Sequence, residues 1–236
     1  MKTVFMCVAF IFGTPALAQS FSEDQIKQLV LEAIRENPEI VMEAVEILRQ
    51  RQEEIKGSQA RAALANYRDQ LENDPNAPVL GNPDGDVTVV EFFDYNCPYC
   101  RRAKPVLEEL LAADPNVRLV FREWPILGEG SVFAARAALA ARKQGKYEEF
   151  HWAMMTLKGR ADEASTLRVA EEIGLDLDRL RAEMDAPEID DHFALSMELT
   201  QALGFSGTPS FVVGDNLIGG LVDAEALIEA VEMARK

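Results

Sequence analysis

The feature that most constrains the fold of this chain is a Cys-Pro-Tyr-Cys tetrad between two segments typical of buried strands. Val87–Phe93 precedes the tetrad and is apolar on both faces apart from Glu91, and residues 117–123 form a second run of the same kind. Residues 104–113, between them, have a helical pattern. A strand, a helix and a second strand of similar burial predict a βαβ unit with parallel pairing.

The tetrad, Cys97-Pro98-Tyr99-Cys100, places two thiols one helical turn apart at the expected start of that helix. A thiolate is the species that attacks a disulfide, and the unpaired N–H groups and partial positive charge of a helix N-terminus stabilise that anion. Pro98 suits the first helical turn, where no N–H is required. We therefore expect Cys97 to be the exposed attacking thiol, Cys100 the partly buried resolving thiol, and a Cys97–Cys100 disulfide the oxidised form.

A zinc site is the alternative interpretation of two cysteines at this spacing. Structural zinc usually needs four Cys or His ligands, and the histidines, His151 and His192, fall in expected helices far along the chain. A lone His in such a helix more often packs against a neighbour or lies at the surface. The strand–tetrad–helix context favours redox chemistry and no metal site.

Two other elements are candidates for the same site. Pro209, preceded by Thr208 and followed by an apolar strand, stands where a cis peptide bond can occur, although position alone favours a strand-initiating proline in trans. Glu91 interrupts the apolar strand before the tetrad. Its carboxylate either relays protons to and from Cys100, or lies at a sheet edge, solvated or paired with Arg122 on the neighbouring strand.

The first residues of the chain have the layout of a secretory signal peptide. Lys2 is followed by a short apolar run, and Ala16-Leu17-Ala18 fits a small-x-small cleavage site. We expect removal of residues 1–18, with cleavage after Ala18, and export to the periplasm. The apolar run is shorter than the roughly 20 residues of a membrane anchor. With 24 basic and 40 acidic residues the chain carries −16, or −17 once Lys2 is lost, which argues against nucleic acid as a partner.

Cleavage would also remove Cys7, one of the three cysteines of the chain, leaving only the pair in the tetrad. A loop closed between cysteines this close contributes little stability, because the entropic gain grows with loop length. The pair is therefore expected to serve reactivity rather than stability.

Residues 19–76 predict a separate N-terminal helical segment. Ser22-Glu23-Asp24-Gln25 fits a capping box, Asn37-Pro38 ends one helix and begins the next, and apolar stripes follow. The stripes hold too few bulky residues for a core, so the segment packs on the main domain or, as we favour, on copies of itself. Gly57-Ser58 marks either a hinge or a tolerated glycine in one continuous helix.

The main domain is expected over residues 77–236. After the βαβ unit, residues 131–203 are mostly helical and form an insertion. Strands at 210–213 and 217–220 flank a Gly-Asp-Asn turn as a hairpin, and Asp223 caps a closing amphipathic helix.

This order of elements, with Gly207-Thr208-Pro209-Ser210-Phe211 before the hairpin, resembles the DsbA family of the thioredoxin superfamily over roughly residues 79–236. Residues 91–100, Phe121–Pro125 and Ala134–Ala141 are similar to that family's active-site stretch, following strand and insertion helix. The resemblance implies an α/β thioredoxin fold with a helical insertion. It also implies that Pro209 is cis beside the cysteine pair and that Thr208 offers backbone hydrogen bonds to an extended substrate.

Phe21–Ile26 and Asn37–Ile40 look like the N-terminal segment of the suppressor-of-copper-sensitivity protein C (ScsC) group, some of whose members trimerise and act as disulfide isomerases. The resemblance implies a helical stalk, a homo-oligomer with a trimer favoured, exported protein substrates with disulfides or thiols, and a membrane-bound reductant similar to DsbD or ScsB. Pro98-Tyr99 replaces the Pro-His dipeptide usual in the DsbA type, and Thr208 resembles the isomerase-type proteins.

Three functions stay open on this sequence. We expect an enzyme, a protein disulfide oxidoreductase with isomerase or reductase activity favoured over oxidase activity and no cofactor beyond its cysteine pair. The alternative is a periplasmic copper-tolerance protein that binds Cu(I), a soft ion, through Cys97 and Cys100. The least favoured is a structural adaptor that keeps the pair as a relic.

Overall fold

A computed structural model describes residues 21–236 of the chain. The expected signal peptide and its cleavage after Ala18 lie outside the described residues. The chain divides into two compact units, one ending at Glu53 and one running from Glu54 to Lys236. No helix among the described residues is both long and apolar enough to cross a membrane.

The first unit contains helix α1 (Glu23–Glu36) and the beginning of α2 (Glu39–Asn73). Ser22 and Gln25 form the predicted capping box, and the break between the helices falls at Asn37-Pro38, also as predicted. None of the residues of α1 is buried. Large apolar side chains of this unit are exposed on both helices: Ile26, Leu29, Val30, Leu31, Ile40, Val41, Met42, Val45, Ile47 and Leu48.

Helix α2 is continuous through Gly57-Ser58, so the structure has no kink at the predicted hinge. Its C-terminal part belongs to the second unit, where Leu64 and Leu71 are buried against Val90 and Phe92. The predicted boundary at 76/77 is therefore displaced, because apolar residues late in α2 complete the core of the main domain.

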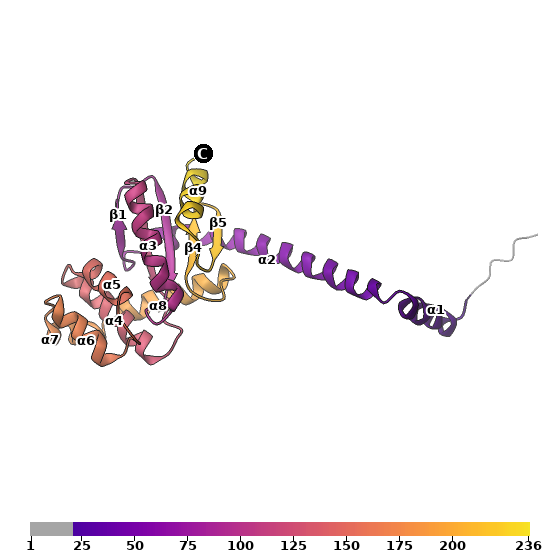
Figure 1. Cartoon of the computed structure of the whole chain (residues 1–236), viewed down its shortest axis with the longest axis horizontal. Coiled ribbons are helices and arrows are strands. Elements are labelled where there is room, and N and C mark those ends of the chain that lie inside the picture. Colours follow the sequence, from indigo (N-terminus) through magenta and orange to yellow (C-terminus); the bar gives the residue numbers. More distant parts are fainter. Residues whose placement is uncertain (1–20) are drawn as a thin grey trace, which may run out of the picture. The chain divides into compact units, whose positions relative to one another are not determined.

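A five-stranded sheet of order β1-β3-β2-β4-β5 organises the second unit (Figure 1). The predicted strands are present as β2 (Val87–Phe93) and β3 (Val117–Glu123), and they pair in parallel as expected. The other strands, β1 (Val79–Gly81), β4 (Ser210–Val213) and β5 (Asn216–Gly219), pair antiparallel with their neighbours.

Helices cover both faces of this sheet. Alternation along β2 sends Val89 and Phe93 to a large core formed with α3 (Pro98–Ala113), α9 (Ala224–Ala234) and the helical insertion. The opposite face packs on the end of α2 and on α8 through a smaller cluster that includes Leu199 and Val212. Both faces are closed, which explains why the central strands are almost continuously apolar.

The insertion consists of α4 (Glu129–Lys143), α5 (Tyr147–Met155), α6 (Glu163–Glu172), α7 (Leu177–Glu183) and α8 (Pro187–Ala202). Figure 1 shows α4 to α7 grouped together. The short helix α7 was not anticipated, because its seven residues are too few to display a clear period. The hairpin and the capped final helix occur where they were expected.

Candidate functional site

The tetrad lies where β2 gives way to α3. Cys97 is the N-cap residue of α3 with extended backbone angles, and Pro98 occupies the start of the helix. This local sequence suits the junction, since proline needs no N–H partner in the first turn. Both cysteines are free thiols, so the structure represents the reduced state of the pair.

The Cys97 thiol is set up to ionise. Its Sγ lies 3.2 Å from the carbonyl oxygen of Thr208, and only 4% of the residue is exposed. A hydrogen bond from the Cys100 side chain is the largest influence on its pKa; the side chain of Thr208 and the backbone amides of Cys100 and Tyr99 act in the same direction. Together they outweigh burial and lower the pKa of Cys97 to about 5. The attacking thiol is thus less exposed than the sequence suggested, but it is anionic at neutral pH.

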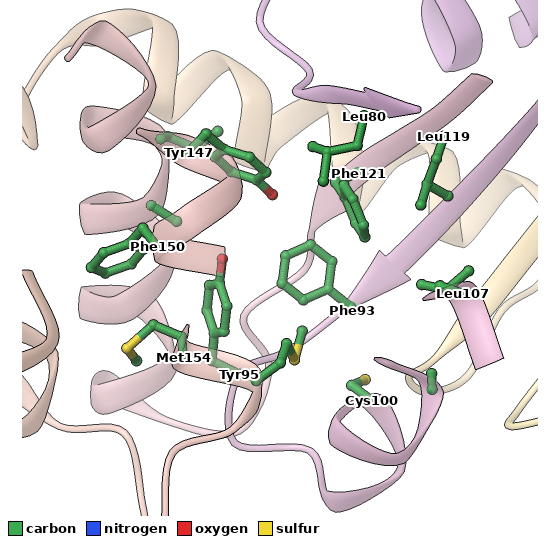
Figure 2. Close-up of a cluster of buried hydrophobic side chains, with 14 of the residues drawn as sticks. Leu80, Phe93, Tyr95, Cys100, Leu107, Leu119, Phe121, Tyr147, Phe150 and Met154 are labelled. Carbon is green, nitrogen blue, oxygen red and sulfur yellow. The ribbon is translucent and has the colours of Figure 1, made fainter. Parts of the chain in front are cut away.

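Cys100 lies on the core side of α3 and is 1% exposed. Figure 2 shows it beside the cluster that contains Phe93 and Leu107. Burial raises the pKa of the Cys100 thiol far above its ordinary value, and the hydrogen bond to Cys97 and the charge of Glu91 add to that effect. The two thiols of one motif therefore differ sharply in acidity, as an attacking and a resolving thiol require.

Glu91 lies on a central strand, opposite Phe121 in the register of β2 and β3, and is 1% exposed. Its Oε1 has no hydrogen-bond partner among the described residues. Burial, and next the charge of Cys97, raises the pKa of this carboxyl well above its usual range. The interpretation as an edge residue is wrong, and so is the pairing with Arg122, because Arg122 binds Asp74 instead.

Thr208 and Pro209 stand beside the tetrad, as expected, and the peptide bond between them is cis. Ser210 closes this turn by donating from its hydroxyl to the carbonyl of Gly207 at 2.7 Å. Next to Cys97, a hollow of about 590 Å³ is lined by Tyr99, Thr208 and neighbouring residues. The hollow is thus bounded by a residue of the tetrad and by the residue whose carbonyl Cys97 contacts.

The loop before the tetrad is tied to the insertion by residues that sequence reasoning did not single out. The buried Asp94 carboxylate accepts hydrogen bonds from the backbone amides of Asn96, Ile126 and Leu127. The Asn96 amide group exchanges hydrogen bonds with the backbone of Ala161. An Asp followed two residues later by a bonded N–H is a recognisable turn signal, but its distant partners are not visible in sequence.

Arg101 completes these ties. Its guanidinium donates to the backbone carbonyls of Tyr95, Leu157 and Gly159. Three acceptors from two separate segments fix the first turn of α3 against the loop after α5 (Tyr147–Met155). The position of the tetrad is therefore held by the insertion as well as by the sheet.

Both histidines are buried helix-packing residues. His151 Nδ1 lies 3.1 Å from the hydroxyl of Tyr95, and its ring packs edge-on against Phe93 with 4.9 Å between the ring centres. Burial lowers the pKa of His151 to about 3, so its imidazole is neutral. Among the described residues neither histidine forms a hydrogen bond with Cys97 or Cys100.

His192 belongs to a buried polar network at the end of α2. Its Nε2 is 2.7 Å from a carboxylate oxygen of Glu123 and its Nδ1 is 3.7 Å from Oδ2 of Asp74. Arg122 binds the same Asp74 oxygen at 2.6 Å, and the Tyr147 hydroxyl donates to Glu123. This network joins α2, β3, α5 and α8 and places no group beside the tetrad.

Comparison with known families identifies this arrangement. The sequence model described as "DSBA-like thioredoxin domain" matches residues 88–232, more than half of the chain. The chain belongs to the DSBA-like thioredoxin domain family. A second model, "Copper resistance protein ScsC N-terminal domain", matches residues 23–54.

Three solved structures are similar to this chain. A thioredoxin-like oxidoreductase from Silicibacter pomeroyi is 67% identical, with a TM-score of 0.71, over 71% of this chain and 97% of that one. Proteus mirabilis ScsC in a transitional conformation is 30% identical, with a TM-score of 0.68, over 94% of this chain and 99% of that one. The thiol-disulfide exchange protein α-DsbA2 from Wolbachia pipientis is 31% identical, with a TM-score of 0.70, over 76% and 97%.

A curated relative with a different name shares the same domain. The Na(+)/H(+) antiporter NhaA 3 of Salinispora tropica is 36% identical over 158 residues, which cover 66% of this chain. The match spans only 24% of the antiporter's length, so its name carries no argument about this chain.

Proposed function

We propose that this protein is an exported thiol–disulfide oxidoreductase that acts on protein disulfides through Cys97 and Cys100. The observation that carries the proposal is the asymmetry of the pair, with an anion-stabilised thiol at the end of a groove and a buried, weakly acidic thiol behind it. Reactive cysteines in this family of folds have lowered pKa values at a helix N-terminus.

In the first step the Cys97 thiolate attacks one sulfur of a substrate disulfide. A Cys97–substrate bond forms, the substrate S–S bond breaks, and the other substrate sulfur leaves as a thiolate with the electron pair. Cys100 then loses its proton and attacks Cys97 Sγ, which releases the second substrate thiolate and leaves the Cys97–Cys100 disulfide. Two electrons have passed to the substrate. In isomerisation a different substrate thiolate attacks the substrate sulfur of the mixed disulfide, which forms a new substrate S–S bond, breaks the Cys97–substrate bond and releases Cys97 as a thiolate, so that the enzyme ends reduced.

Glu91 is proposed as the proton relay for Cys100. The thiolate charge of Cys97 is one cause of the raised pKa of Glu91, and that charge vanishes in the mixed disulfide. The carboxyl group therefore ionises more readily at the step in which Cys100 must release a proton. A buried carboxyl without a fixed partner suits that role better than a structural one.

Isomerase or reductase activity is favoured over oxidase activity. Tyr99 in the tetrad, Thr208 before Pro209 and the match to the ScsC N-terminal model support this preference. The test compares refolding of scrambled ribonuclease by the mature chain, residues 19–236, and by a form beginning at Glu54, where the second unit begins. Restored ribonuclease activity supports an isomerase, whereas rapid oxidation of reduced ribonuclease with no reshuffling refutes it.

The first unit is proposed to join copies of the chain, with a trimer favoured. Its large apolar side chains are about half exposed on both helices, and burying them against identical helices would remove that area from water. Light scattering on residues 19–236 and on residues 54–236 tests this. A monomer in both forms would contradict it.

The proposed location and redox partner of this protein are taken from the proteins to which it is similar. A crystal structure described as a periplasmic thioredoxin-like protein from Salmonella enterica is 28% identical over 71% of this chain. We propose a periplasmic location for this protein too, with protein disulfides or thiols as substrates and a membrane-bound, DsbD-like or ScsB-like reductant that keeps the pair reduced. Trapping of a Cys100→Ser variant in a mixed disulfide with a membrane reductant checks the partner.

A second candidate function is Cu(I) binding by Cys97 and Cys100. The favouring observation is the match of residues 23–54 to a family described as a copper resistance protein domain. Two thiolates suit this soft ion. Competition against a chelator of known affinity, with reduced protein and with a Cys97→Ser variant, tests it; equal Cu(I) retention by both would reject the site.

A further inference from the structure

The hollow beside Cys97 is lined by one positively charged side chain and no carboxylate among the described residues, although the chain as a whole is acidic. Its walls come from the tetrad and α3, from the loop at residues 204–208, and from residues 219–221 after β5. Arg102 is the one charged side chain among the described residues that line it. The chain has 40 acidic residues against 24 basic ones, so a groove wall without a carboxylate departs from the composition of the molecule.

Arg102 is exposed and available to a ligand. Its guanidinium carbon lies 5.5 Å from the centre of the Tyr99 ring, on the first turns of α3. An aromatic face holds a guanidinium by attraction to the ring electrons without neutralising it. Within residues 21–236 no carboxylate forms a salt bridge with Arg102, although most arginines of the second unit have such a partner or bind backbone carbonyls.

The same polarity continues past the loop. A second hollow, of about 460 Å³, shares Gly204 with the first and is lined by Lys56 of α2 and by residues of α8. Its described lining also contains no carboxylate. On the other side of Arg102 a third hollow includes Asp223, whose side chain is engaged as the N-cap of α9 by accepting from the amide of Ala226. The first two hollows together are therefore lined by Arg102 and Lys56 and by no carboxylate among the described residues.

We propose that this groove selects extended polypeptide segments with an acidic residue next to the reacting cysteine, and that Arg102 is the side chain that recognises that charge. The inference rests on the proposed thiol exchange at Cys97 and specifies its substrate class. The net charge of the molecule repels acidic partners at long range, so the preference comes from short-range pairing at the groove.

The test uses short peptides with a single cysteine disulfide-bonded to 5-thio-2-nitrobenzoate, whose release is coloured. Three peptides differ only in the residue preceding the cysteine, which is Glu, Gln or Lys. Attack by the reduced protein breaks the peptide–nitrobenzoate disulfide. Each second-order rate is divided by the rate of the same peptide with 2-mercaptoethanol, which removes the intrinsic effect of the charge on the disulfide.

We expect the Glu peptide to react up to about fivefold faster than the Gln peptide, the scale of one exposed ion pair, and the Lys peptide to react more slowly. Arg102→Gln should abolish the ranking, Arg102→Glu should reverse it, and 0.5 M salt should reduce it. The matched control is Arg168→Gln, which removes an exposed positive charge from α6 outside the groove and should preserve the ranking.

Equal normalised rates for the three peptides with the unaltered protein would overturn the inference, as would identical rankings in Arg102→Gln and Arg168→Gln. Absence of release from every peptide would instead refute the proposed exchange activity. The two failures are therefore distinguishable in one experiment.

Discussion

Replacing Asp74 by Asn removes the charge that compensates Arg122 inside the second unit. The side chains of Arg122 and Asp74 are 0% and 6% exposed, and their nitrogen and oxygen are 2.6 Å apart. Removing one partner of a buried pair costs about 3–5 kcal/mol, because the other charge stays buried and uncompensated. The Asn amide oxygen can still accept one hydrogen bond from Arg122, which places the expected loss of unfolding free energy near about 3 kcal/mol.

Urea unfolding of residues 19–236, followed by tryptophan fluorescence, measures this loss. Trp124 and Trp152 both belong to the second unit, so the signal reports on the part of the chain that contains the pair. The loss corresponds to a fall in Tm of about 6–12 °C, at about 2–4 °C per kcal/mol for a domain of this size. The control is Asp69→Asn, an exposed carboxylate one turn earlier, with an expected change within about 0.5 kcal/mol.

The pH dependence supplies a second check. Burial alone would raise the pKa of Asp74, but the nearby His192 side chain, a hydrogen bond from the amide of Asn76 and the charge of Arg122 hold it well below its ordinary value. A carboxyl whose pKa is lower in the folded state stabilises above its unfolded pKa, and that contribution is lost as the pH falls through the folded value. The difference between the unaltered protein and Asp74→Asn should therefore shrink below about pH 4.

A loss in Asp74→Asn no larger than that in Asp69→Asn would refute the reasoning. So would a difference between Asp74→Asn and the unaltered protein that stays constant down to pH 2. A double variant with Arg122→Met separates the pair from other effects, since its loss should be well below the sum of the two single losses.

Three further outcomes test the site. Alkylation of Cys97 by iodoacetamide should stay near its maximum down to about pH 6 and fall to half near pH 5, because the lowered pKa keeps the thiolate present above that value; a midpoint near 9 would contradict it. Glu91→Gln should leave the attack of Cys97 nearly unchanged but slow release of the mixed disulfide about 10²-fold, as quenched mass spectra would record; equal slowing of both steps would argue against a relay. Asn96→Ala should lower stability by about 1–3 kcal/mol in urea unfolding, because the backbone groups of Ala161 lose their partners, and an unchanged midpoint would mean that water replaces them.

The local sequence pattern was sufficient to predict the central strands of the fold and the arrangement of the two thiols. The almost continuous apolar run of Val87–Phe93 and the one-turn spacing of Cys97 and Cys100 are encoded within a few residues, and both appear in the structure as predicted. The placement of Thr208-Pro209 beside the tetrad came from family resemblance, since position alone favoured a trans proline.

What sequence reasoning missed depends on contacts between distant residues. A pairing of Glu91 with Arg122 was one of the expectations because the two lie on adjacent strands, yet the partner of Arg122 is Asp74, 48 residues away. The stripe that contains Leu64 and Leu71 predicted a helix with an apolar face but could not specify that the sheet covers it. The sequence pattern likewise could not show that His192 accepts a hydrogen bond from the backbone amide of Glu123, 69 residues away.

The contact between Cys97 and the Thr208 carbonyl joins residues 111 positions apart in the chain. During synthesis at about 5–20 residues per second, the ribosome makes both thiols roughly 6 to 22 s before the residue that completes their surroundings. Over that interval the chain presents two cysteines without the hairpin that lies beside them in the finished protein. The surroundings of Cys97 are therefore completed only when the C-terminal strands join the sheet, after nearly all of the chain has been made.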